Sequence, residues 1–219
     1  MTEPVKPRPT AVVVDDSRAV QLGLPLMAPD IDFVAAYPDI ETLLADCPAV
    51  DVVVLDLKLA DGGRSGVRQG PAAIRAVAKA GYRICLYTDE RRRLVLAQCL
   101  RAGAHGVVHK SDSDAVTAAA IDGVARGETV ITQSLVGLAE VVERRGGLPQ
   151  LTARQRDVLR ARARGERWAD IAARLYITEG VAREHMAAVN AKFALYLYGA
   201  SPADMERQLG MAPGDLLDE

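Results

Sequence analysis

Three short apolar runs, each closed by a polar side chain, constrain the fold of this chain most strongly. The runs are residues 11–14, 51–55 and 83–87. The polar residues that follow them are Asp15, Asp16, Asp56 and Thr88. Continuous runs rich in β-branched residues are typical of strands that are buried on both faces of a parallel sheet. The sequence therefore predicts parallel strands whose carboxyl ends carry acids and a hydroxyl.

Two weaker strands and five helices complete an alternating pattern. The weaker strands are residues 31–36 and 106–109, and Lys110 follows the second one. The helices between and after the strands are expected to start near Ser17, Pro38, Pro71, Arg91 and either Ser111 or Ser113. Helical connections force a parallel sheet with helices on both faces. Such a doubly wound α/β sheet places its ligand site at the carboxyl ends of the strands.

The side chains expected at that edge form a distinctive set of charges. Three carboxylates, the Thr88 hydroxyl and the Lys110 ammonium converge there if the sheet forms as predicted. Crowded carboxylates repel one another unless a cation neutralises them, and Mg²⁺ prefers oxygen ligands. A Lys at the rim can hold an incoming phosphoryl group, and a Thr can hydrogen-bond it. These groups therefore indicate a magnesium site that accepts a phosphoryl group.

Residues 10–126 resemble the receiver domain of two-component response regulators through these five groups. The resemblance implies a five-stranded parallel sheet in the order 2-1-3-4-5, and it makes Asp56 the phosphoacceptor. The Mg²⁺ ligands that it implies are Asp15, Asp16, Asp56 and the carbonyl of Lys58. The residues at the positions that sense the phosphate are Thr88, Lys110 and Val107. A cognate histidine kinase is the implied donor of the phosphoryl group.

Several features depart from the receiver pattern and leave two interpretations open. The loop from Lys58 is several residues longer than in the family, Asp89 adds an acid beside the site, and Val107 stands where family members often carry Tyr or Phe. In the first interpretation, Asp56 is still phosphorylated. In the second, Lys58 or Arg64 fills the acidic pocket in place of Mg²⁺. The domain then works without phosphate and responds to a ligand or a partner protein.

Residues 151–193 carry the spacing of three short helices. Gly165 ends the first one, as a glycine at a helix C-terminus does. The second helix is expected over residues 169–175, and a tight corner follows at residues 176–177. Thr178 is a good N-cap for the third helix. Two short helices joined by a corner of a few residues form the pattern of a helix-turn-helix.

This segment resembles the LuxR-type helix-turn-helix domain through LTARQRDVLR at its start, IAARLYITE across the turn, and His185 with Lys192 in the third helix. Residues 151–198 hold nine basic and five acidic side chains, which suits a surface that meets nucleic acid. The resemblance implies that the third helix enters the major groove of double-stranded DNA. The residues that it places at this interface are Thr178, Val181, Ala182, Arg183, Glu184, His185, Ala187 and Lys192. Arg183 is the expected reader of a base or a phosphate, and a last helix from Ser201 is the expected homodimer face.

Together the two halves resemble a response regulator of the NarL/FixJ class. The expected organisation is a disordered tail at residues 1–9, a receiver at 10–126, a linker with a helix at 127–150 and an all-α DNA-binding domain at 151–219. The expected function is that of a bacterial transcription factor, not an enzyme, controlled by phosphorylation of Asp56. A protein-interaction regulator without DNA binding is a further alternative. The three cysteines lack metal-ligand spacing and no apolar run approaches the ~18 residues of a membrane helix, so a cytoplasmic protein without a membrane partner is expected.

Overall fold

The computed structural model describes residues 7–59, 68–148 and 151–209. These residues form two compact units, one within Met1–Glu90 and Ala102–Glu128 and the other within Arg91–Arg101 and Thr129–Glu219. None of the helices in the described ranges combines the length and the apolar character that a bilayer-spanning helix needs. Arg64, which the sequence places in the long loop, lies outside the described residues, as do residues 1–6 of the expected tail.

The first unit is built on a five-stranded parallel sheet in the order β2-β1-β3-β4-β5. Its strands are β1 (Thr10–Val14), β2 (Asp32–Tyr37), β3 (Val52–Leu55), β4 (Ile84–Thr88) and β5 (Gly106–His109). The order confirms the predicted topology, and each strand end lies within one residue of the prediction. The three strong apolar runs form β1, β3 and β4, whose apolar side chains are almost fully buried.

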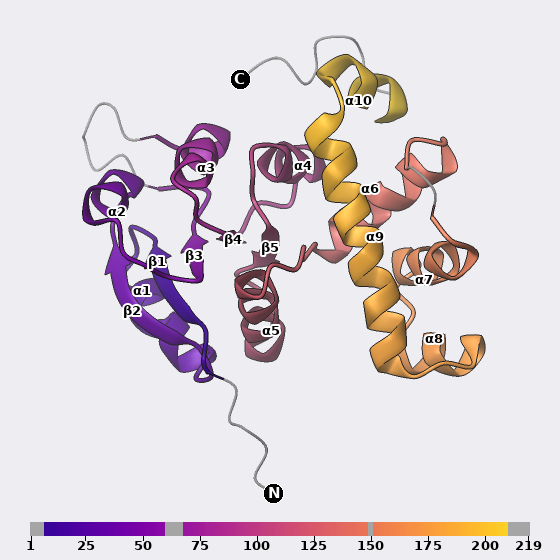
Figure 1. Cartoon of the computed structure of the whole chain (residues 1–219), viewed down its shortest axis with the longest axis horizontal. Helices are drawn as coiled ribbons and strands as arrows, with labels where there is room; N and C mark the ends of the chain where they lie inside the picture. Colours follow the sequence, from indigo (N-terminus) through magenta and orange to yellow (C-terminus); the bar gives the residue numbers. More distant parts are fainter. Residues whose placement is uncertain (1–6, 60–67, 149–150, 210–219) are drawn as a thin grey trace, which may run out of the picture. The chain divides into compact units, whose positions relative to one another are not determined.

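Helices cover both faces of this sheet. They include α1 (Arg18–Met27), α2 (Ile40–Asp46), α3 (Gly70–Lys79) and α5 (Asp114–Ala125). Helix α1 contacts α5, and α2 contacts α3, so the helices pair on opposite faces. Figure 1 shows α2 and α3 on one side of the strands and α1 and α5 on the other. The doubly wound α/β class predicted from the alternating pattern is therefore confirmed.

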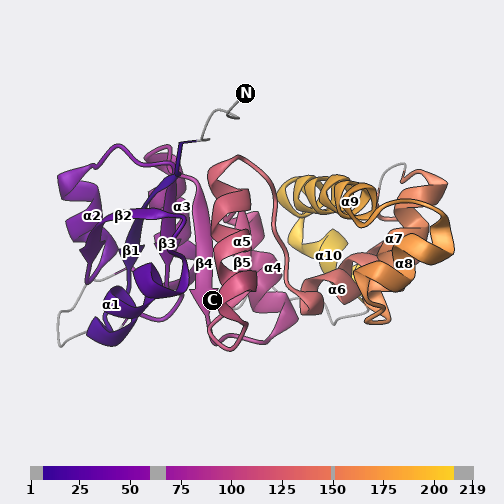
Figure 2. The same ribbon diagram turned by 90° about the horizontal axis from the view of Figure 1, so that it is seen from below.

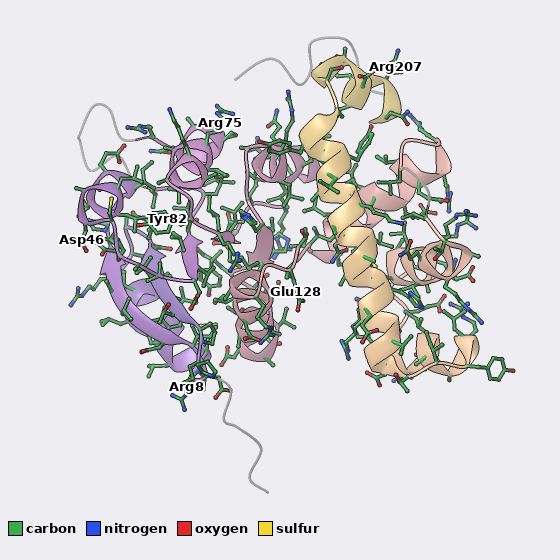
Figure 3. The ribbon with its side chains drawn as sticks, in the orientation of Figure 1. Arg8, Asp46, Arg75, Tyr82, Glu128 and Arg207 are labelled. Atoms are coloured by element: carbon green, nitrogen blue, oxygen red, sulfur yellow. The ribbon has the colours of Figure 1, made fainter. Side chains whose placement is uncertain are left out.

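Two tyrosines fix the segment that follows α2. Tyr37 at the end of β2 donates a hydrogen bond to the Asp46 carboxylate. That hydrogen bond and burial raise the pKa of Tyr37 to about 12. Tyr82 donates to the carbonyl of Pro48 at 3.0 Å, and Figure 3 labels Asp46 and Tyr82. These contacts hold the connection into β3, and therefore help to place Asp56 at the end of that strand.

The second unit is entirely helical in its described part. Its helices are α4 (Arg93–Arg101), α6 (Gln133–Arg144), α7 (Ala153–Ala163), α8 (Trp168–Leu175), α9 (Glu179–Gly199) and α10 (Pro202–Leu209). Helix α9 is its longest element and contacts α4, α7 and α8, as Figure 2 also shows for α7 and α9. Helix α10 carries an ion pair between Arg207, labelled in Figure 3, and Asp204. Helix α4 lies between β4 and β5 in the sequence but groups with this unit.

The bounds of α7, α8 and α9 follow from local capping. Thr152 and Gln155 form a reciprocal capping box at the start of α7, and Gly165 adopts a φ of 80° after its end. Tyr176 adopts the left-handed conformation, with φ 55° and ψ 45°, and makes the predicted corner. The Thr178 hydroxyl accepts a hydrogen bond from the backbone N–H of Val181 at 3.2 Å, which confirms the predicted N-cap of α9. The helix-turn-helix pattern is thus formed as predicted.

Candidate functional site

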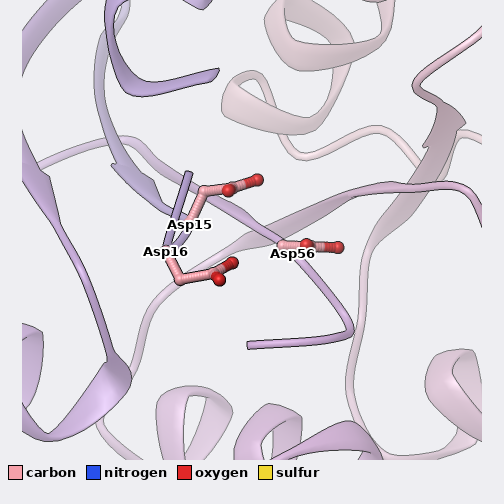
Figure 4. Close-up of side chains that lie close together, drawn as sticks. All are labelled: Asp15, Asp16 and Asp56. Atoms are coloured by element: carbon pink, nitrogen blue, oxygen red, sulfur yellow. The ribbon is translucent and has the colours of Figure 1, made fainter. Parts of the chain in front are cut away.

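Three carboxylates meet at the carboxyl edge of the sheet. Val14 of β1 and Leu55 of β3 lie side by side in the ladder, so Asp15 and Asp56 follow neighbouring strands at the same level. One carboxylate oxygen from each of Asp15, Asp16 and Asp56 lies within 4.8 Å of the other two. Figure 4 shows the three carboxylates close together. The structure thus assembles the predicted acidic group.

Lys110 neutralises part of this group. It follows β5, and its backbone N–H donates to the carbonyl of Thr88 at 3.0 Å. Its Nζ donates to Asp15 Oδ2 at 2.8 Å and to Asp56 Oδ2 at 2.9 Å. The Lys110 side chain is only 18% exposed, and those of Asp15 and Asp56 are 2% and 9% exposed. A shielded ammonium therefore bridges two shielded carboxylates.

The pKa values of Asp56 and Lys110 depend on two opposing effects, which are burial of the charged groups and the attraction between them. Burial raises the pKa of Asp56 above its ordinary value, while the hydrogen bond and the positive charge of Lys110 act in the opposite direction. Burial acts to lower the pKa of Lys110, but its hydrogen bonds to Asp15 and Asp56, together with the negative charges of these two carboxylates, outweigh burial and raise that pKa. The ammonium therefore stays protonated and bridges the carboxylates of Asp15 and Asp56, with the carboxylate of Asp16 close by.

The neighbouring residues complete the edge of the site. Thr88 is 1% exposed, and its hydroxyl accepts a hydrogen bond from the backbone N–H of Glu90 at 3.1 Å. Asp89 points outward in an exposed position, whereas Glu90 is buried at 5% exposure. Val107 is 1% exposed in β5 and has no polar group to offer. The aromatic ring that lies near the site is instead that of Tyr87, with Lys110 Nζ 5.6 Å from its centroid.

The loop after Asp56 was expected to offer a cation to the acidic group through Lys58 or Arg64. The side chain of Lys58 is exposed, whereas its backbone hydrogen-bonds the Asp56 carboxylate. Lys110 provides a cation to Asp15 and Asp56, and Arg64 lies outside the described residues, so the replacement of Mg²⁺ by a loop cation stays a prediction. Three clustered carboxylate oxygens, two from buried residues, are donors of the type that Mg²⁺ prefers. The residues present therefore fit a magnesium ion, which would relieve the repulsion that a single ammonium leaves.

The predicted DNA-contacting residues lie at the start and along the length of α9. Their exposure separates them into two groups. The exposed or half-exposed residues are Thr178, Val181, Arg183, Glu184, His185, Ala187 and Lys192. Ala182 is 0% exposed, because its methyl group faces the helical core, so it cannot reach a base and we remove it from the interface. Lys192 donates to Gln155 Oε1 at 2.9 Å, which ties it to the capping box of α7.

Arg183 is held by neighbours on two helices. Its guanidinium pairs with Glu179, one turn earlier on α9, at 2.8 Å. It also lies over the indole ring of Trp168, 4.9 Å from the ring centroid. The guanidinium of Arg162, from α7, lies over the same ring at 4.5 Å. The best candidate reader of the sequence analysis is therefore part of a three-residue stack.

Three residues that surround these sites were not among the predicted site residues: Tyr87, Arg162 and Trp168. Tyr87 immediately precedes Thr88, so an aromatic residue at the end of a strand next to the site was a usable signal. A Trp at the first position of the second helix, after an Arg-rich first helix, was a second signal. Side-chain direction decides both contacts, and the spacing of residues alone does not supply it.

Comparisons with known proteins extend these observations. No family model matches the chain. It is 30% identical over 193 residues to the probable transcriptional regulatory protein SgaR of Hyphomicrobium methylovorum, covering 85% of this chain and 87% of SgaR. It is 30% identical over 172 residues to the probable transcriptional regulatory protein NarL of Mycobacterium tuberculosis, covering 77% of each.

Solved structures share the fold at lower identity. The response regulator RcsB of Salmonella typhimurium matches with a TM-score of 0.54 at 18% identity, over 94% of this chain and 99% of that chain. A structure of two RcsB dimers bound to two parallel DNAs also matches with a TM-score of 0.54, at 17% identity, over 93% of this chain and 98% of that chain. The parallel sheet with its acidic edge, the helix-turn-helix and the two relatives at 30% identity lead to one conclusion. The chain belongs to the NarL/FixJ class of response regulators.

Proposed function

We propose that this protein is a cytoplasmic transcription factor that binds double-stranded DNA as a homodimer and is controlled by phosphorylation of Asp56. The observation that carries the proposal is the bridge from Lys110 Nζ to Asp15 and Asp56, at 2.8 and 2.9 Å, beside the third carboxylate of Asp16. Such a site holds an oxygen nucleophile, a metal-binding set and a cation within reach of one another. It is suited to accept a phosphoryl group and to respond to its charge.

In the proposed reaction, a carboxylate oxygen of Asp56 attacks the phosphorus of a phosphohistidine or of acetyl phosphate. The bond from phosphorus to the donor breaks, and the donor leaves with the electron pair of that bond. Bound Mg²⁺ would neutralise the phosphoryl oxygens there. Asp56 must be ionised to attack, and the positive charge of Lys110 favours that form. After transfer, Lys110 can pair with a phosphoryl oxygen, and the Thr88 hydroxyl can donate to another.

The second unit supplies the proposed output. Its α8 and α9 form a helix-turn-helix, and the exposed start of α9 carries Arg183. A solved neighbour, RcsB, is described as dimers bound to DNA. A dimer of this chain would place two copies of α9 in major grooves about one helical turn apart. Phosphorylation would change how often that dimer forms or how freely α9 reaches the duplex.

Mass spectrometry and a gel shift together test this function. Incubation of the full chain with acetyl phosphate and Mg²⁺ should add one phosphoryl group, and Asp56→Asn should abolish the addition. The phosphorylated protein should bind genomic fragments with an affinity different from that of Asp56→Asn. Absence of any mass increase with every donor tried, together with equal binding by wild type and Asp56→Asn, would refute control by phosphorylation.

A second candidate is a DNA-binding regulator that works without phosphate. One observation favours it: Val107, buried in β5, lacks the aromatic ring of a phosphate-sensing switch. In that case the gel shift remains positive while the mass does not change. A protein-interaction regulator without DNA binding would give a negative gel shift under all salt conditions, including low salt.

A further inference from the structure

The indole of Trp168 lies where three helices of the second unit meet. Trp168 is the first residue of α8 and the single tryptophan of the chain. Arg162 reaches it from α7, with its guanidinium carbon 4.5 Å from the ring centroid. Arg183 reaches it from the exposed start of α9, at 4.9 Å. Both distances lie within the range of a cation–π contact, so one ring holds two guanidinium groups.

Each guanidinium group also has polar partners other than the ring. Arg183 pairs with Glu179 at 2.8 Å, and its side chain is 54% exposed. Arg162 donates to Gln133 Oε1 at 3.0 Å and to the carbonyl of Glu166. Gln133 in turn donates to the carbonyl of Arg162. Arg162 is therefore anchored among backbone and amide oxygens, whereas Arg183 keeps a large exposed surface for another partner.

The indole ring is uncharged, so it does not neutralise the two guanidinium groups that lie against it. Burial lowers the pKa of Arg162, and the positive charge of Arg183 lowers it further. The two guanidinium groups therefore repel each other, and an anion bound beside Arg183 would reduce that repulsion. An exposed Arg normally loses considerable rotamer freedom on binding, and stacking on a ring reduces that loss in advance.

We propose that Trp168 is a positioning residue for DNA binding, which holds Arg183 stacked and extended toward the duplex, with Arg162 fixing the ring from α7. This role rests on the DNA binding proposed above. Trp168, in the first turn of α8, then contributes to DNA binding through the position of Arg183. The alternative is that Trp168 fills space between helices and affects DNA only by keeping the unit folded.

A double-mutant cycle in the full chain separates these two roles. The probe is a labelled duplex selected by the wild-type protein from genomic fragments at low salt. Trp168→Leu, which keeps an apolar side chain but removes the ring, should weaken binding about two- to fivefold per half-site. Arg183→Ala should weaken it at least about fivefold. In the Arg183→Ala background, Trp168→Leu should have no further effect, because the residue that it positions is gone.

Conservative variants and fluorescence supply the controls. Trp168→Phe keeps a ring face and should retain most of the affinity. Since Trp168 is the single tryptophan, its emission and its accessibility to acrylamide report directly on the stack. Arg162→Ala and Arg183→Ala should each change that emission. Arg164→Ala should not, because Arg164 pairs with Glu166 and is the matched arginine outside the stack.

The outcomes distinguish this role from the function on which it rests. Wild-type protein that binds no duplex would refute DNA binding, and the role of Trp168 with it. Wild-type protein that binds, with Trp168→Leu either equal to wild type or equally damaging in both backgrounds, would refute the positioning role alone. Circular dichroism of each variant shows whether the unit is folded. A folded Trp168→Leu variant with weakened binding, and no added effect in the Arg183→Ala background, supports the proposal.

Discussion

At the scale of single residues, Lys110 and Asp56 show how burial and attraction act against each other in one pocket. The carboxylate of Asp56 loses solvent and gains an ammonium at 2.9 Å. Its pKa is nevertheless raised, so burial has the larger effect. Ionisation of a phosphoacceptor that is buried in this way costs free energy. A bound metal ion or a phosphoryl transfer can offset that cost.

The unfavourable ionisation of buried Asp56 predicts that Asp56→Asn changes the stability of the protein in a pH-dependent way in the absence of Mg²⁺. Because the folded pKa of Asp56 is raised above its ordinary value of 3.8, its contribution to stability is present below that pH and is lost as the pH rises through the folded pKa. Asn does not titrate. The variant should therefore have a higher melting temperature than wild type at pH 7, and the difference should shrink below about pH 4.

Asp51→Asn is a matched control with the opposite sign. Asp51 accepts hydrogen bonds from the backbone and the hydroxyl of Thr10 at 2.8 and 2.9 Å, which lower its pKa below 3.8. Its contribution to stability is present above that value and is lost as the pH falls through the folded pKa. Asp51→Asn should therefore melt below wild type at pH 7. Thermal melts in which both variants shift in the same direction at pH 7 would contradict this account.

At the scale of elements, the start of α9 combines a good cap with a weak first turn. Thr178 caps the helix through the N–H of Val181, and Gly180 occupies the exposed first turn. A Cβ at position 180 would meet only the Thr178 hydroxyl, at 3.7 Å, so an alanine fits without strain. The two positions therefore offer opposite changes in helix stability at the same end of one helix.

Thr178→Ala should lower the free energy of unfolding by about 1 kcal/mol, because it removes the cap. Gly180→Ala should raise it by up to about 1 kcal/mol, because alanine loses less backbone freedom in a helix. For a chain of this size each change corresponds to roughly 2–4 °C in melting temperature. Thermal melts followed by circular dichroism measure both. A Gly180→Ala variant that melts below wild type would show that the turn needs a residue without a side chain.

The elements also show what the sequence predicts and what it leaves open. Continuous apolar runs predicted β1, β3 and β4 to within one residue, because strands buried on both faces have few alternatives. The weaker β2 and β5 were predicted from the alternation of strands and helices. Capping residues such as Thr178 fixed the helix-turn-helix in the same way. The burial of Ala182 was not predicted, because the rotation of a long helix about its axis depends on its neighbours. The convergence of Lys110 with the carboxylates was predicted from the expected sheet, but its bridge to Asp15 and Asp56 was not, and neither was the stack on Trp168.

At the scale of the whole molecule, the positive charge of the second unit is largely paired within the unit. Of the nine basic residues at positions 151–198, six make ion pairs with acids of the same unit. They are Arg156, Arg160, Arg164, Arg167, Arg174 and Arg183. An Arg that already has a carboxylate partner must exchange it before it can neutralise a phosphate. The composition therefore overstates the positive charge that can meet DNA without the loss of an ion pair.

This pairing predicts a modest salt dependence of DNA binding. About three phosphate contacts per protomer would give a dimer a slope near −5 in a plot of the logarithm of affinity against the logarithm of salt concentration. Glu179→Gln removes the partner of Arg183 and should steepen the slope by about 1 per protomer. Fluorescence anisotropy titrations at several salt concentrations measure both slopes. An unchanged slope in Glu179→Gln would mean that Arg183 does not meet a phosphate.

The bridge from Lys110 to Asp15 and Asp56 also has a consequence for chemical labelling. Acylating reagents attack the neutral amine, and a raised pKa leaves little of that form at neutral pH. The side chain of Lys58 is exposed and therefore accessible to the reagent. The extent of acylation at Lys110 relative to Lys58 therefore reports whether Asp15 and Asp56 still bind the Lys110 ammonium. Peptide mapping measures this ratio in any buffer or extract.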